Sequence, residues 1–158
     1  MTIGKFWLGS LLALAPLTAA GAQTAPTAQP TFATAPFLPG AWSYRAIPGG
    51  SEAAFLDTAG IRRLVVQCAL ASRQISLSLT STVPAQSMFV WTSTASRTIA
   101  ARYDQGGFQV IAPLAARDPL LDAIAFSRGR FALSVPGSLA VVLSSQPEPA
   151  RAIEDCRI

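Results

Sequence analysis

Two aspartates, Asp118 and Asp122, are the residues of this sequence best suited to acid–base chemistry. A pair of carboxyl groups can hydrolyse a glycosidic bond when one acts as the acid and the other as base or nucleophile. These two residues, however, stand four positions apart at the predicted start of a helix, where free N–H groups stabilise negative charge. We therefore expect Asp118 to cap that helix, and we predict no catalytic residue.

The residue types that most other catalytic sites require are missing. The sequence contains no histidine, which excludes Ser-His-Asp and Cys-His catalysis. Its one lysine, Lys5, lies in a segment that we expect to be cleaved off, so Schiff-base chemistry is not expected either. The sequence has no glycine-rich phosphate loop, no G-x-S-x-G motif and no C-x-x-C pair. We accordingly predict no cofactor and no metal.

Cys68 and Cys156 are the two cysteines of the chain, and we expect them to form a structural disulfide. An even number of cysteines in an exported protein usually indicates bridges. A redox pair and a metal site are the alternatives, but neither cysteine belongs to a C-x-x-C pair and no histidine is present to complete a metal site. The bridge would tie a central strand to the end of the chain, where it would prevent fraying.

Phe89 and Trp91 belong to a segment in which both alternating faces are apolar, because Met88 and Val90 occupy the other face. This segment is therefore either a strand buried on both faces or a strand with an exposed apolar patch. A patch of this kind would be a candidate interaction surface, and we assign Phe89 and Trp91 to it.

Two arginines complete this candidate interaction surface. Arg128 and Arg130 could clamp an anion, although they also flank the predicted end of a helix, which would direct both side chains into solvent. Five aromatic residues could line a ligand pocket, but in a small β domain such side chains more often belong to the core. They are Trp42, Tyr44, Phe89, Trp91 and Tyr103.

The elements that position these residues are mostly β-strands. Polar and apolar residues alternate along several short segments, most clearly over 74–80, where Ile75, Leu77 and Leu79 face one side. Such alternation is typical of half-buried strands in an antiparallel sheet. Turn residues recur about every 8–12 positions between these segments. The pattern therefore predicts a mainly β domain over 41–158 that forms an antiparallel β-sandwich or a curled sheet.

Two short helices and two tight turns are expected within this domain. One helix covers about 119–127 behind its N-cap Asp118, and a short C-terminal helix covers about 149–155. Residues 104–107 have the composition of a hairpin turn. Residues 135–138 carry proline and glycine at the positions that a type II turn requires.

Residues 1–22 have the three parts of a bacterial-type secretory signal peptide: a short basic start, an apolar run and small residues before a cleavage site. The apolar run, interrupted by Pro16, is too short to span a bilayer. We predict cleavage after Ala22, followed by a disordered Pro/Ala/Thr-rich tether over 23–40. The mature chain should have no transmembrane segment and should work in the periplasm or outside the cell.

The charge of the chain is basic but dispersed. Its formal net charge is +4 and its isoelectric point is about 9.8. A high isoelectric point can indicate a nucleic-acid-binding protein. The basic residues form no run, however, and an exported protein does not meet cellular nucleic acid. We therefore do not expect a nucleic-acid partner.

The C-terminal third contains the segment DPLLDAIAFSRGRF at 118–131 and the segment IEDCR at 153–157. These segments resemble uncharacterised exported proteins of alphaproteobacteria. A late strand–turn–strand followed by a short helix and a final cysteine is also similar to the invasion-associated locus B type of small exported β proteins. The resemblance implies an exported protein with a single domain and implies no particular activity.

Three functions are compatible with these observations. The first is a non-enzymatic envelope protein that acts by protein–protein contact, as an adaptor or inhibitor, with an unknown envelope or secreted partner. The second is a binder of a small apolar ligand that uses the aromatic residues. The third is a carboxylate-dependent hydrolase of cell-wall sugar. We expect the first, because the chain lacks a catalytic set and carries the two-sided apolar strand around Trp91.

Overall fold

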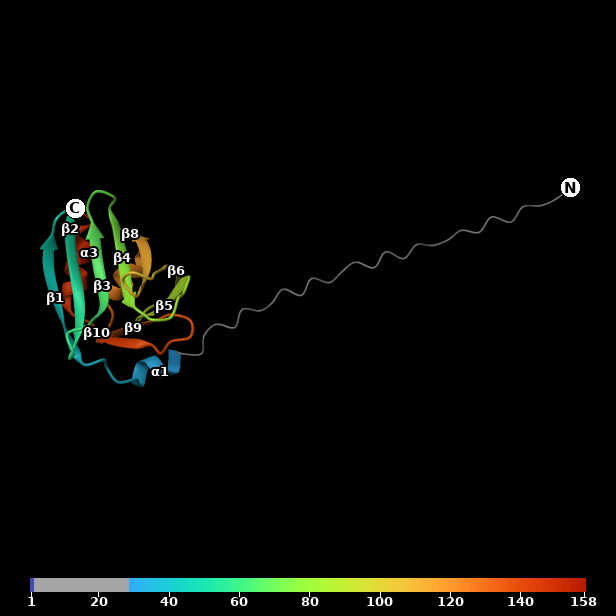
Figure 1. The fold of residues 1–158 in the computed structure, drawn as a ribbon, viewed down its shortest axis with the longest axis horizontal. Coiled ribbons are helices and arrows are strands. Elements are labelled where there is room, and N and C mark those ends of the chain that lie inside the picture. The colour runs from blue at the N-terminus through green and yellow to red at the C-terminus, as the bar shows by residue number, and fades with distance from the viewer. Residues whose placement is uncertain (2–28) are drawn as a thin grey trace.

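The computed structural model describes Met1 and residues 29–158, most of which belong to antiparallel strands (Figure 1). The predicted signal peptide beyond Met1, its cleavage site and residues 23–28 of the predicted tether lie outside the described residues. The expected mainly β fold, with two antiparallel sheets and short helices, is confirmed.

Ten strands and three short helices follow one another along the described part of the chain. In order they are α1 (Gln29–Thr34), β1 (Gly40–Ile47), β2 (Gly50–Asp57), β3 (Arg62–Ala69), β4 (Gln74–Thr80), β5 (Ser87–Trp91), β6 (Ser96–Ala100), β7 (Arg102–Asp104), β8 (Gln109–Ala115), α2 (Pro119–Ala125), β9 (Arg130–Ser134), β10 (Val141–Ser144) and α3 (Pro147–Asp155).

The strands form two sheets that share a core. The order in the six-stranded sheet is β1-β2-β3-β4-β8-β7, and the order in the four-stranded sheet is β10-β9-β5-β6. The chain passes from the smaller sheet to the larger one at Ala101, between β6 and β7. Strands β9 and β10 run across the lower ends of the larger sheet rather than along its strands (Figure 1). The result is an open, curled sandwich rather than a closed barrel.

The core lies between the two sheets and takes alternate residues of each strand. In β3, Leu64 and Val66 are fully buried, whereas the residues between them point outward. In β5 of the other sheet, Met88 and Val90 are fully buried against them in the same cluster. In β3 and β4, the period-two pattern of the sequence therefore corresponds to the face of the strand that is buried, whereas β2 and β9 are buried on both faces.

Of the two aromatic residues of β1, Trp42 belongs to the core and Tyr44 packs against it, partly buried. The ring of Trp42 packs edge-on against Phe55 and stacks on Phe131, with centroids 5.5 and 6.1 Å away. Its Nε1–H donates a hydrogen bond of 3.0 Å to the carbonyl oxygen of Ser144. Trp42 thereby joins the first strand of the larger sheet to both strands at the edge of the smaller one.

Both predicted turns are present. Gly137 has φ of +81°, a conformation that glycine adopts at no steric cost, and the N–H of Ser138 donates to the carbonyl of Val135 at 3.0 Å. Antiparallel pairing of β9 and β10 follows across this turn. The second turn joins β7 to β8, and there the N–H of Gly106 donates to Asp104 Oδ1 at 3.2 Å.

Helix α2 begins at Pro119, as expected, but ends at Ala125, two residues before the expected end. Asp118 Oδ1 accepts the N–H of Leu120 at 2.8 Å, which confirms the N-cap. The helix is capped at its C-terminal end by Phe126, so Gly129, with φ of +73°, does not terminate it but turns the chain toward β9. Helix α3 starts at Pro147, two residues before the expected position.

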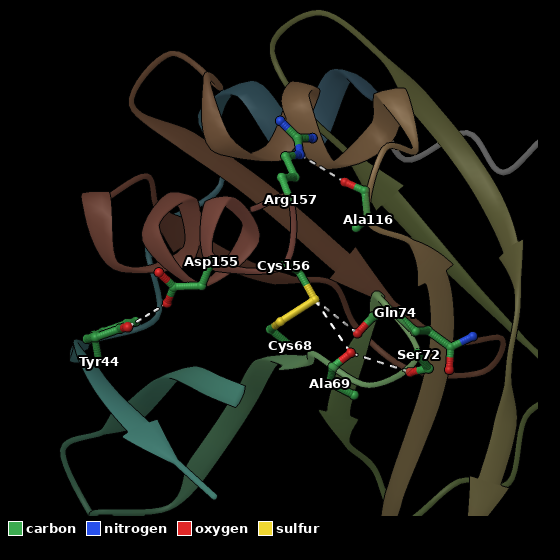
Figure 2. Close-up of a disulfide and its surroundings, with 9 residues drawn as sticks. All are labelled: Tyr44, Cys68, Ala69, Ser72, Gln74, Ala116, Asp155, Cys156 and Arg157. Atoms are coloured by element: carbon green, nitrogen blue, oxygen red, sulfur yellow. Dashed lines mark hydrogen bonds between the residues drawn. A yellow bond between two sulfur atoms is a disulfide. The ribbon is translucent and has the colours of Figure 1, made fainter. Parts of the chain in front are cut away.

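The predicted disulfide between Cys68 and Cys156 is present and joins β3 to the end of α3, with 5.4 Å between the two Cα atoms (Figure 2). Two further contacts hold the same segment. The hydroxyl of Tyr44 donates to Asp155 Oδ2 at 2.5 Å, and Arg157 Nε donates to the carbonyl of Ala116 at 2.8 Å. The C-terminal segment is thus tied to β1, to β3 and to the loop before α2.

The described part of the predicted tether differs from a free linker. Residues 29–34 form α1, and the N–H of Leu38 donates to the carbonyl of Val142 at 2.8 Å. Phe32 and Ala35 pack against the outer side of the four-stranded sheet. Apolar side chains among the prolines and alanines explain the difference, because they gain from burial on an apolar sheet surface.

Replacing both Cys68 and Cys156 by alanine should lower the free energy of unfolding by about 2–5 kcal/mol, because the bridge restricts a long loop in the unfolded chain. Urea unfolding of the oxidised wild type and of the double variant measures the difference. Alkylation without reduction should leave both cysteines unmodified in the wild type. Labelling of both under that condition would contradict the bridge.

Candidate functional site

Phe89 and Trp91 lie two residues apart on β5 and point to the same side of the four-stranded sheet. Their ring centroids are 5.9 Å apart. This is the outer side, because Met88 and Val90 point into the core. Trp91 is 5% exposed, whereas Phe89 is half-buried. The two-sided apolar strand is therefore covered on both faces at Trp91 and partly open at Phe89.

The cover over Trp91 comes from distant parts of the chain. Trp91, Ala132 and Val142 form a small second cluster on the outer side of the sheet, and Phe32 and Ala35 pack against it. The end of α1 and the residue after it therefore lie over β9 and β10, as the position of α1 below these strands also shows (Figure 1).

Arg130 holds this covering segment in place. Its Nη1 donates to the carbonyl oxygens of Ala35 at 2.9 Å and Phe32 at 3.4 Å, and its guanidinium lies 4.4 Å from the ring centre of Phe37. Arg128, by contrast, is exposed in the turn after α2, where its backbone N–H donates to Ser93 Oγ. The predicted pair of arginines is thus separated, and Arg130 has a structural role beside the site.

An apolar groove of about 570 Å³ opens next to Trp91. Phe89, Trp91 and Val142 contribute to its lining from β5 and β10. The segment 32–36 and the loop 135–140 also line it. We call this feature the apolar groove.

The groove suits an apolar molecule. Among the described residues that line it, none carries an ionisable side chain. Ser134 and Ser138 are its hydroxyl groups, and that of Ser138 already donates to the carbonyl of Val135 at 3.0 Å. A site with these properties can bind by burying apolar surface.

The sequence alone identified two residues of the groove but not the other residues that line it. Phe89 and Trp91 were identified by the two apolar faces of their strand. Phe32 and Pro36 fell in the predicted tether, and Leu139 in a predicted hairpin. One feature of the sequence could have indicated Phe32. A phenylalanine in a segment of proline, alanine and threonine contributes to stability only when its side chain is buried.

The two aspartates have structural partners. Asp118 caps α2 and its Oδ2 accepts from Arg97 at 2.7 Å, while Asp122 Oδ1 lies 2.8 Å from Arg157 Nη1. Partial burial raises the pKa of Asp118, but hydrogen bonds from Arg97 and the N–H of Leu120 outweigh it and lower the pKa below 3.8. A general acid requires the opposite shift.

In the part of the chain that the structure describes, no group of three or more His, Cys, Asp or Glu side chains is arranged to hold a metal ion. No helix within Met1 and residues 29–158 combines the length and apolar character needed to cross a membrane. No known protein family, curated protein or solved structure matches this chain. The resemblance to small exported proteins remains an expectation from the sequence.

Asp118→Ala should lower the free energy of unfolding by about 1 kcal/mol at neutral pH, since it removes the N-cap. The pKa of Asp118 is lowered by folding, so its contribution is present above pH 3.8 and disappears as the pH falls through the folded-state value. Urea unfolding at several pH values tests this. A difference from wild type that persists unchanged in strong acid would contradict it, and Asp122→Ala, at a more exposed ion pair, is the control.

Proposed function

We propose that the protein is an exported, non-enzymatic binding protein that holds a small apolar ligand in the apolar groove. The observation that carries this proposal is the groove itself, about 570 Å³ in volume and lined by Phe89 and Trp91. Ligand pockets typically measure about 300–1,000 Å³ and are lined mainly by apolar side chains.

The shape of the site favours a ligand over a flat contact surface. A flat apolar patch would require Trp91 to be exposed, and it is 5% exposed. Phe89 instead lies half-buried at the groove, where an occupant would complete its burial. The lining supports a slender apolar molecule such as a fatty acyl chain, because it offers extensive apolar surface and few hydrogen-bonding groups.

The proposal includes two further statements: the protein is exported, and it is not an enzyme. The disulfide supports an oxidising compartment, such as the periplasm or the exterior, reached after cleavage near Ala22. The aspartates of α2 support a non-enzymatic function, since both are engaged in a cap and in ion pairs.

Laurate should displace the apolar dye Nile red from the purified, disulfide-bonded protein, with one saturable site. Ala140→Trp should weaken binding of the dye at least tenfold, because an indole at this exposed lining position fills the groove. Ala59→Trp, in the exposed turn between β2 and β3, is the matched control and should bind as the wild type does. Equal binding by Ala140→Trp and the wild type would refute the proposed site.

Contact with an envelope or secreted protein is the second candidate function. Leu139 supports it, because this residue is 92% exposed at the tip of the β9–β10 hairpin and also lines the groove. Covering an exposed leucine with a partner removes its apolar surface from water, which is favourable. In this alternative the partner would place an apolar side chain in the groove, and the protein would act as an adaptor or inhibitor.

Leu139→Ser should abolish recovery of a specific partner from envelope extract if the hairpin is the contact. Leu70→Ser, at an exposed leucine in the turn between β3 and β4, is the control and should retain the partner. Mass spectrometry of material bound to wild type and to both variants provides the comparison. A partner that both variants retain equally would exclude this hairpin as the contact.

A further inference from the structure

A second recess lies on the outer face of the six-stranded sheet, on the opposite side of the core from the apolar groove. It measures about 580 Å³. Val65, Ser78 and Ile111 lie directly opposite one another on β3, β4 and β8 and contribute to its lining. Because the side chain of Ser78 is shorter than those of Val65 and Ile111, the surface of the sheet is recessed at β4, the central one of these three strands. We call this recess the sheet hollow.

Phe108 stands at the edge of the sheet hollow in an unfavourable conformation. Its φ is +48°, in the left-handed region, which is sterically unfavourable for a residue with a side chain. Its side chain is 57% exposed and lies outside the core clusters, so burial does not offset this cost. Glycine would fit the backbone better at this position. Residues held in unfavourable backbone conformations cluster at functional sites, which makes Phe108 a candidate binding residue.

The polar groups around the hollow are fixed in place. Arg62 donates to Glu52 Oε1 at 2.6 Å, and Arg45 donates to the same oxygen at 2.7 Å. Burial raises the pKa of Glu52, but Arg62 and Arg45 outweigh it, so the carboxyl stays ionised and continues to orient both guanidinium groups. The side-chain nitrogen of Gln109 is similarly held by Asp104 at 3.3 Å.

This combination selects among ligand classes. A lipid would require a continuous apolar lining, which Glu52, Arg62 and Gln67 interrupt. A nucleic acid would require several unpaired cations, whereas Arg62 and Arg45 share one carboxylate. A sugar presents an apolar C–H face and a rim of hydroxyl groups. An exposed aromatic ring beside amide and guanidinium groups matches both of these features.

We propose that the sheet hollow binds a saccharide, with one pyranose ring stacked on Phe108 and its hydroxyl groups bonded to Gln67, Gln109 and Arg62. This site is independent of the apolar groove, because the two lie on the outer faces of different sheets and share no lining residue. It gives the protein a means of attaching to a cell-surface or cell-wall glycan.

Titration of the full disulfide-bonded protein with chitotetraose, cellotetraose, maltotetraose and trigalacturonate, followed by NMR, tests the proposal. At least one of these should bind saturably at millimolar concentration or below, and Phe108→Ala should weaken it at least tenfold. Phe126→Ala is the matched control, since this phenylalanine is 73% exposed away from the hollow. Absence of binding by all four probes, or equal binding by Phe108→Ala, would overturn the proposal.

Phe108→Gly separates a binding role from a structural one. Glycine adopts a positive φ without strain, so this variant should melt at the same temperature as the wild type or higher while it loses saccharide binding. A clearly lower melting temperature would show that Phe108 supports the fold and would overturn the proposal. Ala140→Trp should leave saccharide binding unchanged, so a failure of the apolar groove is distinguishable from a failure of the sheet hollow.

Discussion

The bond between Cys68 and Cys156 is the constraint on which much of the remaining structure depends. Helix α3 has nine residues and is too short to be stable alone in water. The disulfide holds the end of α3 on β3. The buried residues of this helix, Ala152 and Ile153, close the core over β1, β2 and β3. Arg157 then bonds the loop before α2, so the two helices are fixed relative to each other. An open sandwich is completed in this way without further strands.

The two outer faces of the sandwich differ in chemistry because their neighbours differ. On the smaller sheet, the end of α1 and the residue after it cover Trp91 and leave an apolar groove beside it. On the larger sheet no helix covers the described residues of the hollow, and its lining mixes polar side chains with aliphatic ones and with the exposed ring of Phe108. The two proposed sites, for an apolar molecule and for a glycan, therefore lie on opposite sides of the shared core.

Much of the fold was predictable because its signals are local. Alternation over 74–80 depends on which side of one strand meets the core, and the type II turn at 135–138 depends on proline and glycine alone. The cap by Asp118 is local too. The end of α2 was less predictable, since the backbone N–H of Phe126 reaches Asp122 and Ile124 before Gly129 is met.

The sequence by itself determined the class of fold, the pairing of the two cysteines and the identity of β5 as a strand with two apolar faces. Tertiary structure decided what covers that strand. Segments near residues 32, 89 and 139 must meet to form the groove, and no pattern within any one of them records the other two. The same holds for Phe108, whose exposure depends on where β4 and β8 place the turn before it. Whether a side chain is buried depends on residues that are distant in the sequence, whereas periodicity reflects only the residues within one strand or helix.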